Sequence, residues 1–214
     1  MKTRAELKAM AEAQIKGNIG ILFVISLIIG AISIAANWLL GLIPVVGSLA
    51  ATVIVTPAFT ISVLRVYQNL ALAQKPQVGD AFTGFDDFWT AFKAQLLVSV
   101  FTFLWSLLFV IPGIIKGFSY SQTMMVVAEN KGISAREALN RSKAMMEGHK
   151  MDLFVLNLSF IGWVLLCGIT FGIAYIWVGP YMQATLVNFY NDVKPAPEES
   201  VVEQPVEAEV APAE

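Results

Sequence analysis

The sequence predicts an all-α, polytopic membrane protein whose helices pack as a bundle in the lipid bilayer. Hydrophobic residues make up 57% of the chain and charged residues only 14%, and the mean hydropathy is +0.67. Soluble domains usually contain about 25% charged residues. Inside lipid, apolar stretches must be helical, because no water is available to the backbone N–H and C=O groups. Five long stretches contain no charged residue: 19–42, 45–64, 96–115, 153–169 and 173–189.

The first of these stretches is long enough to span a membrane. A helix needs roughly 20 apolar residues to cross a hydrocarbon core of about 30 Å. Stretch 19–42 meets this length, and Asn37 is its only strongly polar residue. The segment before it mixes lysines with Glu6 and Glu12, and the apolar core of a signal peptide has only about 7–15 residues. We therefore expect stretch 19–42 to be a membrane span and not a cleaved signal.

The positions of Lys and Arg predict the topology, because cytoplasmic loops are enriched in these residues. With the N-terminus inside, a hairpin at Ile43-Pro44 returns the chain to the cytoplasm. The basic segments 65–93 and 129–152 are then cytoplasmic as well. An even number of crossings must separate these two segments. This reasoning predicts six transmembrane helices in three hairpins, a multipass protein with both termini in the cytoplasm.

Two further turns complete the predicted layout. Pro112-Gly113 is expected to turn the second hairpin, since proline lacks a helical donor and glycine tolerates unusual dihedral angles. This turn separates helix 95–111 from helix 114–128. The latter would be about 22 Å long, shorter than the bilayer, so the sequence leaves open whether it spans fully. The third hairpin is expected to bend around Phe171.

Each predicted hairpin follows an amphipathic segment. Such segments are typical of helices that lie in the membrane interface, and equally of helices that pack beneath a bundle. The sequence leaves both interpretations open, and both place the segments in the cytoplasm. Ser134 and Glu137 form a capping box that predicts where the third segment begins. The adjacent Asp86 and Asp87 point in different directions on a helix, and we expect them on a solvated face. The apolar stripes are Leu7, Met10, Ala11 and Ile15, then Phe85, Phe88, Trp89 and Phe92, and then Ala135, Ala138, Leu139, Ser142, Met145 and Met146.

The composition changes near the C-terminus and divides the chain in two. Residues 1–193 are expected to form the membrane-embedded helical domain. Residues 194–214 contain six glutamates, four prolines and no aromatic residue. Such a segment cannot bury enough apolar area to offset the entropy lost on ordering. We therefore expect a disordered acidic tail.

The strongest candidate for a polar site surrounds Lys116, the cation that the predicted topology places away from the cytoplasm. Ser119, Tyr120 and Gln122 follow it in the sequence. Ionisable groups at membrane depth are costly and often functional. In the alternative interpretation, Lys116 lies close enough to the hairpin turn for its side chain to reach the outer headgroups.

Catalytic, cofactor-binding and metal sites are not predicted. His149 is the only histidine, and Cys167, the only cysteine, lies in an apolar stretch. Neither residue has the neighbouring ligands that a metal site or disulfide requires. We also find no nucleophile–base pair, so we expect no enzyme. The sequence favours a non-enzymatic membrane module that interacts with membrane lipids and with a protein partner or a second copy, but not with nucleic acid. The alternative is a small-solute transporter or channel.

Several motifs, spread over roughly residues 3–192, point to a known family. The longest reads Leu-Trp-Ser-Leu-Leu-Phe-Val-Ile-Pro-Gly-Ile-Ile-Lys over residues 104–116 and is followed by Tyr120. Together the motifs resemble a bacterial membrane family catalogued as domain of unknown function 975. The resemblance implies a multipass protein of the bacterial cell membrane, and it implies no reaction or substrate. The other motifs lie at residues 4–8, 16–18, 138–142, 146–150, 158–163, 179–181 and 189–190.

Overall fold

The computed structural model describes residues 2–41, 46–108 and 110–195, and these residues form helices joined by short turns. The predicted all-α class is confirmed for this part of the chain, where no strand is found. The helices in chain order are α1 (Arg4–Ile15), α2 (Ile19–Gly41), α3 (Val46–Ala71), the 3-10 helix η1 (Val78–Phe85), α4 (Phe88–Leu108), α5 (Val110–Tyr120), α6 (Thr123–Glu129), α7 (Ala135–Met145), α8 (Lys150–Leu158), α9 (Ile161–Ile169) and α10 (Tyr175–Val193).

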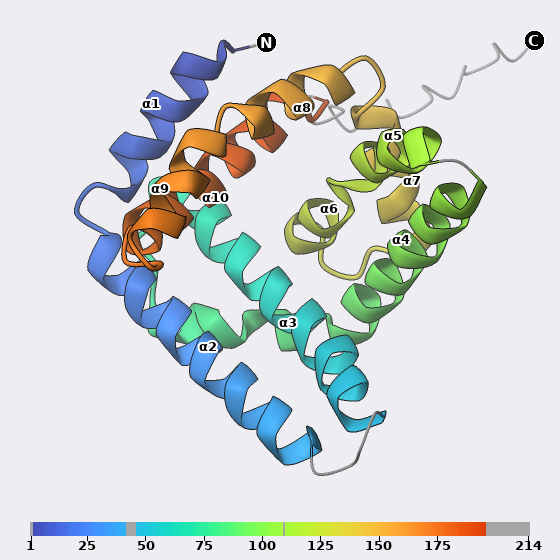
Figure 1. Ribbon diagram of the computed structural model, residues 1–214, viewed down its shortest axis with the longest axis horizontal. Coiled ribbons are helices and arrows are strands. Elements are labelled where there is room, and N and C mark those ends of the chain that lie inside the picture. Colours follow the sequence, from blue (N-terminus) through green and yellow to red (C-terminus); the bar gives the residue numbers. More distant parts are fainter. Residues whose placement is uncertain (1, 42–45, 109, 196–214) are drawn as a thin grey trace, which may run out of the picture.

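Helix α3 runs through the middle of the molecule and contacts α2, η1, α4, α6 and α10 (Figure 1). Its buried side chains include Ile61 and Val66, which belong to a core shared with Leu22 of α2 and Val126 of α6. Burying a side chain of this size stabilises the fold by about 1.5–3 kcal/mol. A second core cluster joins α1, α8 and α10 around Phe160.

Two of the three amphipathic segments pack against the bundle. The stripe of α1 is buried, with Leu7 and Ala11 at most 2% exposed, and α1 lies against α10. The stripe of α7 is buried in the same way against α4 and α6. The interpretation as helices packed beneath a bundle is therefore correct for these two. The predicted N-cap of α7 is also confirmed, because Ser134 Oγ accepts a hydrogen bond from the Glu137 N–H at 3.2 Å.

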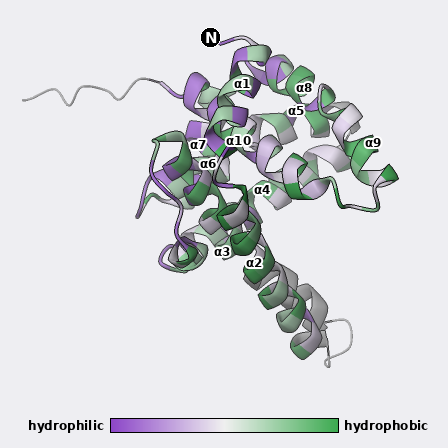
Figure 2. Ribbon diagram, turned by 90° about the vertical axis from the view of Figure 1, so that its left-hand side faces the viewer, coloured by the Kyte–Doolittle hydropathy of each residue, from purple (hydrophilic) through white to green (hydrophobic). Residues whose placement is uncertain are grey.

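The described residues contain three helical stretches that are long and apolar enough to cross a membrane, whereas the sequence predicted six. These are Ile19–Leu39, Phe88–Leu107 and Lys150–Ile169. Predicted span 45–64 begins outside the described residues and continues into α3. Predicted span 173–189 falls in α10, whose second half is buried in the protein core. Figure 2 shows hydrophilic residues gathered around α7, while α2 and α3 reach away from the other helices.

The predicted continuous helix 114–128 is wrong. Helix α5 ends at Tyr120 and α6 begins at Thr123, so the chain turns between them. The hydroxyl of Ser142 on α7 compensates for the interruption. It donates to the Ser119 carbonyl at 2.9 Å and accepts from the Gln122 N–H at 3.1 Å. A partner 20 residues away in the sequence thus supplies hydrogen bonds where the helix breaks.

The prediction that Pro112-Gly113 forms the second turn is also wrong. Helix α5 begins at Val110, so both residues lie in its first turn, where the missing N–H of proline carries no penalty. Gly113 instead permits close contact with α4. A Cβ atom at this position would lie 2.3 Å from Ser106 Oγ and 2.7 Å from its Cα. The small pair holds α4 and α5 together.

The third hairpin has the predicted turn and an additional bend. Helix α9 ends at Ile169 and α10 begins at Tyr175. Between them, Gly172 has a φ of 86°, a left-handed conformation that glycine adopts without strain. The turn around Phe171 is therefore confirmed. The additional bend interrupts the predicted span 153–169, because α8 ends at Leu158 and α9 begins at Ile161. Between them, Ser159 Oγ donates to the Leu156 carbonyl at 2.5 Å.

Candidate functional site

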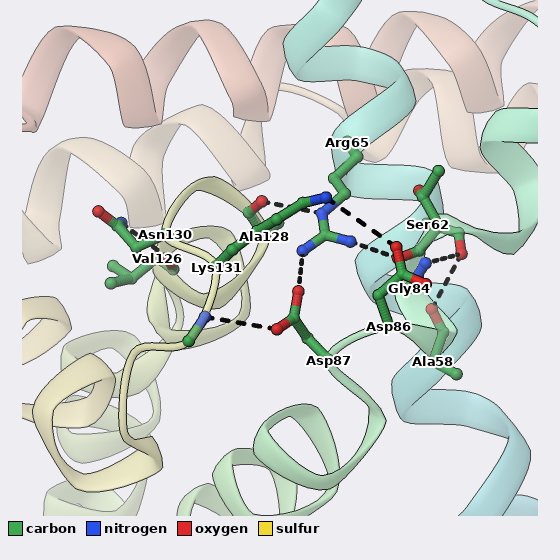
Figure 3. Close-up of polar contacts among 12 residues, drawn as sticks. Ala58, Ser62, Arg65, Gly84, Asp86, Asp87, Val126, Ala128, Asn130 and Lys131 are labelled. Carbon is green, nitrogen blue, oxygen red and sulfur yellow. Dashed lines mark hydrogen bonds and ion pairs between the residues drawn. The ribbon is translucent and has the colours of Figure 1, made fainter.

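A buried arginine, Arg65 of α3, joins three segments that are distant in the sequence (Figure 3). Its Nε donates to the Ala128 carbonyl at 3.0 Å, and its two terminal nitrogens donate to the Thr83 carbonyl and to the Asp87 carboxylate. Only 7% of Arg65 is exposed. A guanidinium suits this position because its donors point in several fixed directions. The contacts tie α3 to η1, to the start of α4 and to the end of α6, and we call them the Arg65 junction.

Asp87 does not lie on a solvated face, contrary to the sequence-based expectation. Its side chain is 13% exposed and pairs with Arg65. Its second oxygen accepts from the Gly132 N–H at 3.4 Å, which adds the loop before α7 to the junction. Asp86 does face solvent, with its side chain 65% exposed and 4.0 Å from the Lys131 ammonium. The two carboxylates point in different directions, as expected, but Asp87 pairs with the buried Arg65.

Helix η1 lies directly on α3 beside the Arg65 junction. The Gly84 N–H donates to Ser62 Oγ at 2.9 Å, and Ser62 Oγ donates to the Ala58 carbonyl at 3.2 Å. A Cβ atom on Gly84 would lie 2.0 Å from the Ala58 carbonyl oxygen. The two backbones therefore touch. The rings of Phe59 and Phe85 extend this contact edge to face, with centroids 5.3 Å apart.

A second polar cluster connects the end of α6 to the end of α10. The Glu129 carboxylate accepts a hydrogen bond from the Tyr190 hydroxyl and pairs with the Lys194 ammonium at 2.6 Å. Burial, together with the hydrogen bond to Glu129, raises the pKa of Tyr190. The phenol therefore stays protonated and remains a donor. The cluster fixes the last turn of α10 beside the Arg65 junction.

Two open hollows border the Glu129–Lys194 pair. The larger, of about 780 Å³, is also lined by Arg141 and His149. The smaller, of about 510 Å³, is also lined by Arg65. Both are open to the surface and contain charges of both signs. Such a surface can hold a polar ligand or a protein segment through charge-assisted hydrogen bonds.

The residues of the predicted polar site lie elsewhere, along α5 and the turn after it. The Lys116 ammonium sits over the Trp105 ring, 4.8 Å from its centroid, in a cation–π contact. Ser119 and Gln122 are buried, and their backbone C=O and N–H groups, respectively, are hydrogen-bonded to the Ser142 hydroxyl. Tyr120 is 8% exposed. None of the four lines the two hollows described above. A polar path at Lys116 stays a prediction.

Comparison with known proteins assigns the family. The sequence model of a family described as "Protein of unknown function (DUF975)" matches residues 1–116 and 107–196. The chain belongs to this family. No curated protein and no solved structure matches it. The resemblance to this family noted in the sequence is thereby confirmed, and the two DUF975 matches overlap at residues 107–116, which include the end of α4 and the start of α5.

One signal in this DUF975 chain could have revealed the Arg65 junction. Arg65 is the only charged residue between Lys16 and Lys75. A single charge in such an apolar region has to be paired or to reach water, because an isolated buried charge is very costly. The His149 side chain, by contrast, makes no capping hydrogen bond. The residue occupies the N-cap position of α8, with Nδ1 3.3 Å from Asp152.

Proposed function

We propose that the protein is a non-enzymatic, multipass module of the bacterial cytoplasmic membrane that engages lipid or protein partners. The observation that carries this proposal is the exposure of the apolar helices. On α2, Leu27 is 57% and Ile34 64% exposed, and on α4, Phe103 is 65% exposed. Water-soluble proteins rarely expose continuous apolar surfaces of this size. Lipid around these helices would remove the surface from water.

A role in organising partners, as opposed to catalysis, is supported by how the polar groups are used. Arg65, Asp87 and Ser142 are engaged in hydrogen bonds that hold helices together. Among the described residues, no three His, Cys, Asp or Glu side chains come together as a metal site would require. The two hollows beside Glu129 provide the surface at which a partner would bind.

The orientation follows from the basic residues around these hollows. Arg141 and Lys131 both lie beside them, and positive charge favours the cytoplasmic side. A labelling experiment tests this orientation, in a variant in which Cys167 is replaced by serine and a single cysteine is placed at position 141 or 171. A membrane-impermeant maleimide added to intact cells is expected to label position 171, at the exposed α9–α10 turn, and not position 141.

Permeabilised cells provide the control for this labelling, since position 141 should then react as readily as position 171. Arg141 is half exposed in the structure, so a cysteine there is accessible once the membrane is open. Efficient labelling of position 141 in intact cells would refute the proposed topology. Equal protection of both positions would show that the α9–α10 turn does not reach the outer surface.

Replacement of Lys116 separates the membrane module from a transporter. Arginine keeps the positive charge and can also stack on Trp105. Lys116→Arg is therefore expected to complement a deletion strain fully, and Lys116→Leu nearly so. The measurement is complementation at matched protein abundance. Loss of complementation by Lys116→Arg at normal abundance would support a solute path instead, because a guanidinium differs from an ammonium in size and hydrogen-bond geometry.

A further inference from the structure

The second amphipathic segment differs from the other two, because several of its large apolar side chains remain exposed beside the bundle. In η1 and the first turn of α4, Val78 is 41%, Phe82 47%, Phe85 45% and Trp89 68% exposed. The Trp89 ring also contacts its neighbours Phe88 and Phe92, with centroids 5.5 and 6.1 Å away. We call residues 78–92 the η1 elbow. Its exposed side thus carries four large apolar side chains.

The Arg65 junction determines that this surface points outward. The opposite side of η1 carries Ala81 and Gly84, both buried, and Gly84 touches the α3 backbone. Arg65 holds the middle of the segment, where η1 ends and α4 begins, through the Thr83 carbonyl and the Asp87 carboxylate. Helix η1 cannot rotate its aromatic side chains into the core without breaking these contacts.

The surroundings of the η1 elbow identify its partner as lipid. Helix α4 continues directly from it as the candidate span Phe88–Leu107, where Leu96 and Val100 remain exposed. Lys93, which follows Phe92 in the sequence, is exposed, and a lysine at this position can extend to the headgroups. Tryptophan is enriched where the acyl chains meet the headgroups. The apolar surface is thus continuous with a predicted membrane contact and has a cation at its edge.

We propose that the η1 elbow lies in the plane of the membrane interface, with Val78, Phe82, Phe85 and Trp89 inserted between the lipid headgroups and the upper acyl chains. Amphipathic segments bind membranes in this way with their apolar side about 5–10 Å deep. The inference rests on the proposed membrane location and adds that η1 anchors the base of α4 to the lipid.

Depth-dependent fluorescence quenching tests this placement. The full chain, with Cys167 replaced by alanine, receives a single cysteine at Phe82, labelled with an environment-sensitive fluorophore and reconstituted into phosphatidylcholine vesicles. Bromine atoms are placed on the acyl chains either near the headgroup or near the chain end. Label at position 82 is expected to lose more fluorescence with shallow than with deep bromine. Val78→Cys provides a second reporter on the same surface.

Two reference positions make the outcomes distinguishable. A label at Leu27, in the α2 span, should be quenched by acyl bromine, and a label at Lys143, exposed on α7, should not be quenched. Quenching at Leu27 without quenching at positions 82 and 78 would overturn the elbow placement and leave the membrane location intact. Stronger quenching of position 82 by deep than by shallow bromine would also overturn it. Absence of quenching at positions 27, 78 and 82 alike would refute the proposed membrane function itself.

Discussion

Replacing Arg65 with methionine is expected to lower the free energy of unfolding by about 3–5 kcal/mol, the usual cost of removing one partner from a buried ion pair. Methionine fills part of the space but donates no hydrogen bond. The Asp87 carboxylate and the carbonyls of Thr83 and Ala128 would then lose their shared donor. In a protein of this length, that corresponds to a fall of roughly 6–20 °C in the unfolding temperature, measurable by a thermal scan in detergent.

An exposed ion pair provides the matched control. Arg141 pairs with Glu137 at 2.8 Å, but both side chains are about half exposed. Arg141→Met should therefore cost no more than about 1 kcal/mol. Removing both buried charges, in Arg65→Met with Asp87→Leu, should recover part of the loss, because no unpaired carboxylate remains. If Arg65→Met and Arg141→Met melt at the same temperature, the Arg65 junction contributes no more to stability than an exposed ion pair.

The apolar stretches predicted much of the helical layout. Stretch 19–42 corresponds to α2, and the turn around Phe171 lies where the sequence placed it. These features depend on local chemistry, namely a run of apolar residues that must be helical in lipid, and a glycine that accepts a left-handed conformation. Local signals of this kind can be read from one sequence alone.

The errors arose where a distant side chain decides the local structure. Helix 114–128 looks continuous, but Ser142 on another helix stabilises a break in it. Asp87 looks solvated, but Arg65 approaches it from α3. The spacing of residues in the sequence does not predict either contact, because only the packing of α3, η1 and α7 brings the groups together. Among the described residues, three stretches and not six are long and apolar enough to span, and in α10 the residues of the second half are covered by protein.

The candidate site, too, could be predicted only in part from the sequence. Lys116 was singled out because of its depth in the predicted topology, and the structure places it over Trp105. Arg65 was assigned only to a cytoplasmic loop, although it is the single charge in a long apolar region. Because burying a lone charge is costly, such a residue is a strong candidate for a structural or functional role. The identity of its partners required the fold.

Replacing Gly84 with alanine is expected to be the next most damaging change, at about 1–3 kcal/mol, the usual cost of overpacking a core. The new methyl group would lie 2.0 Å from the Ala58 carbonyl oxygen and 2.8 Å from the Ser62 nitrogen. Both are backbone atoms of α3, so no side-chain rotation can relieve the clash. Helix η1 would have to move away from α3, weakening the Gly84–Ser62 hydrogen bond of 2.9 Å.

Gly79→Ala is the matched control, because it makes the same chemical change in the same 3-10 helix. A Cβ atom at Gly79 meets nothing within 4 Å. This variant should unfold at the parent temperature or slightly above it, since alanine restricts the unfolded chain more than glycine does. Thermal unfolding of the two variants in detergent therefore measures the contact between η1 and α3 directly. Equal unfolding temperatures would mean that η1 is not held against α3 in the folded protein, and that the outward orientation of Phe82 and Trp89 has another cause.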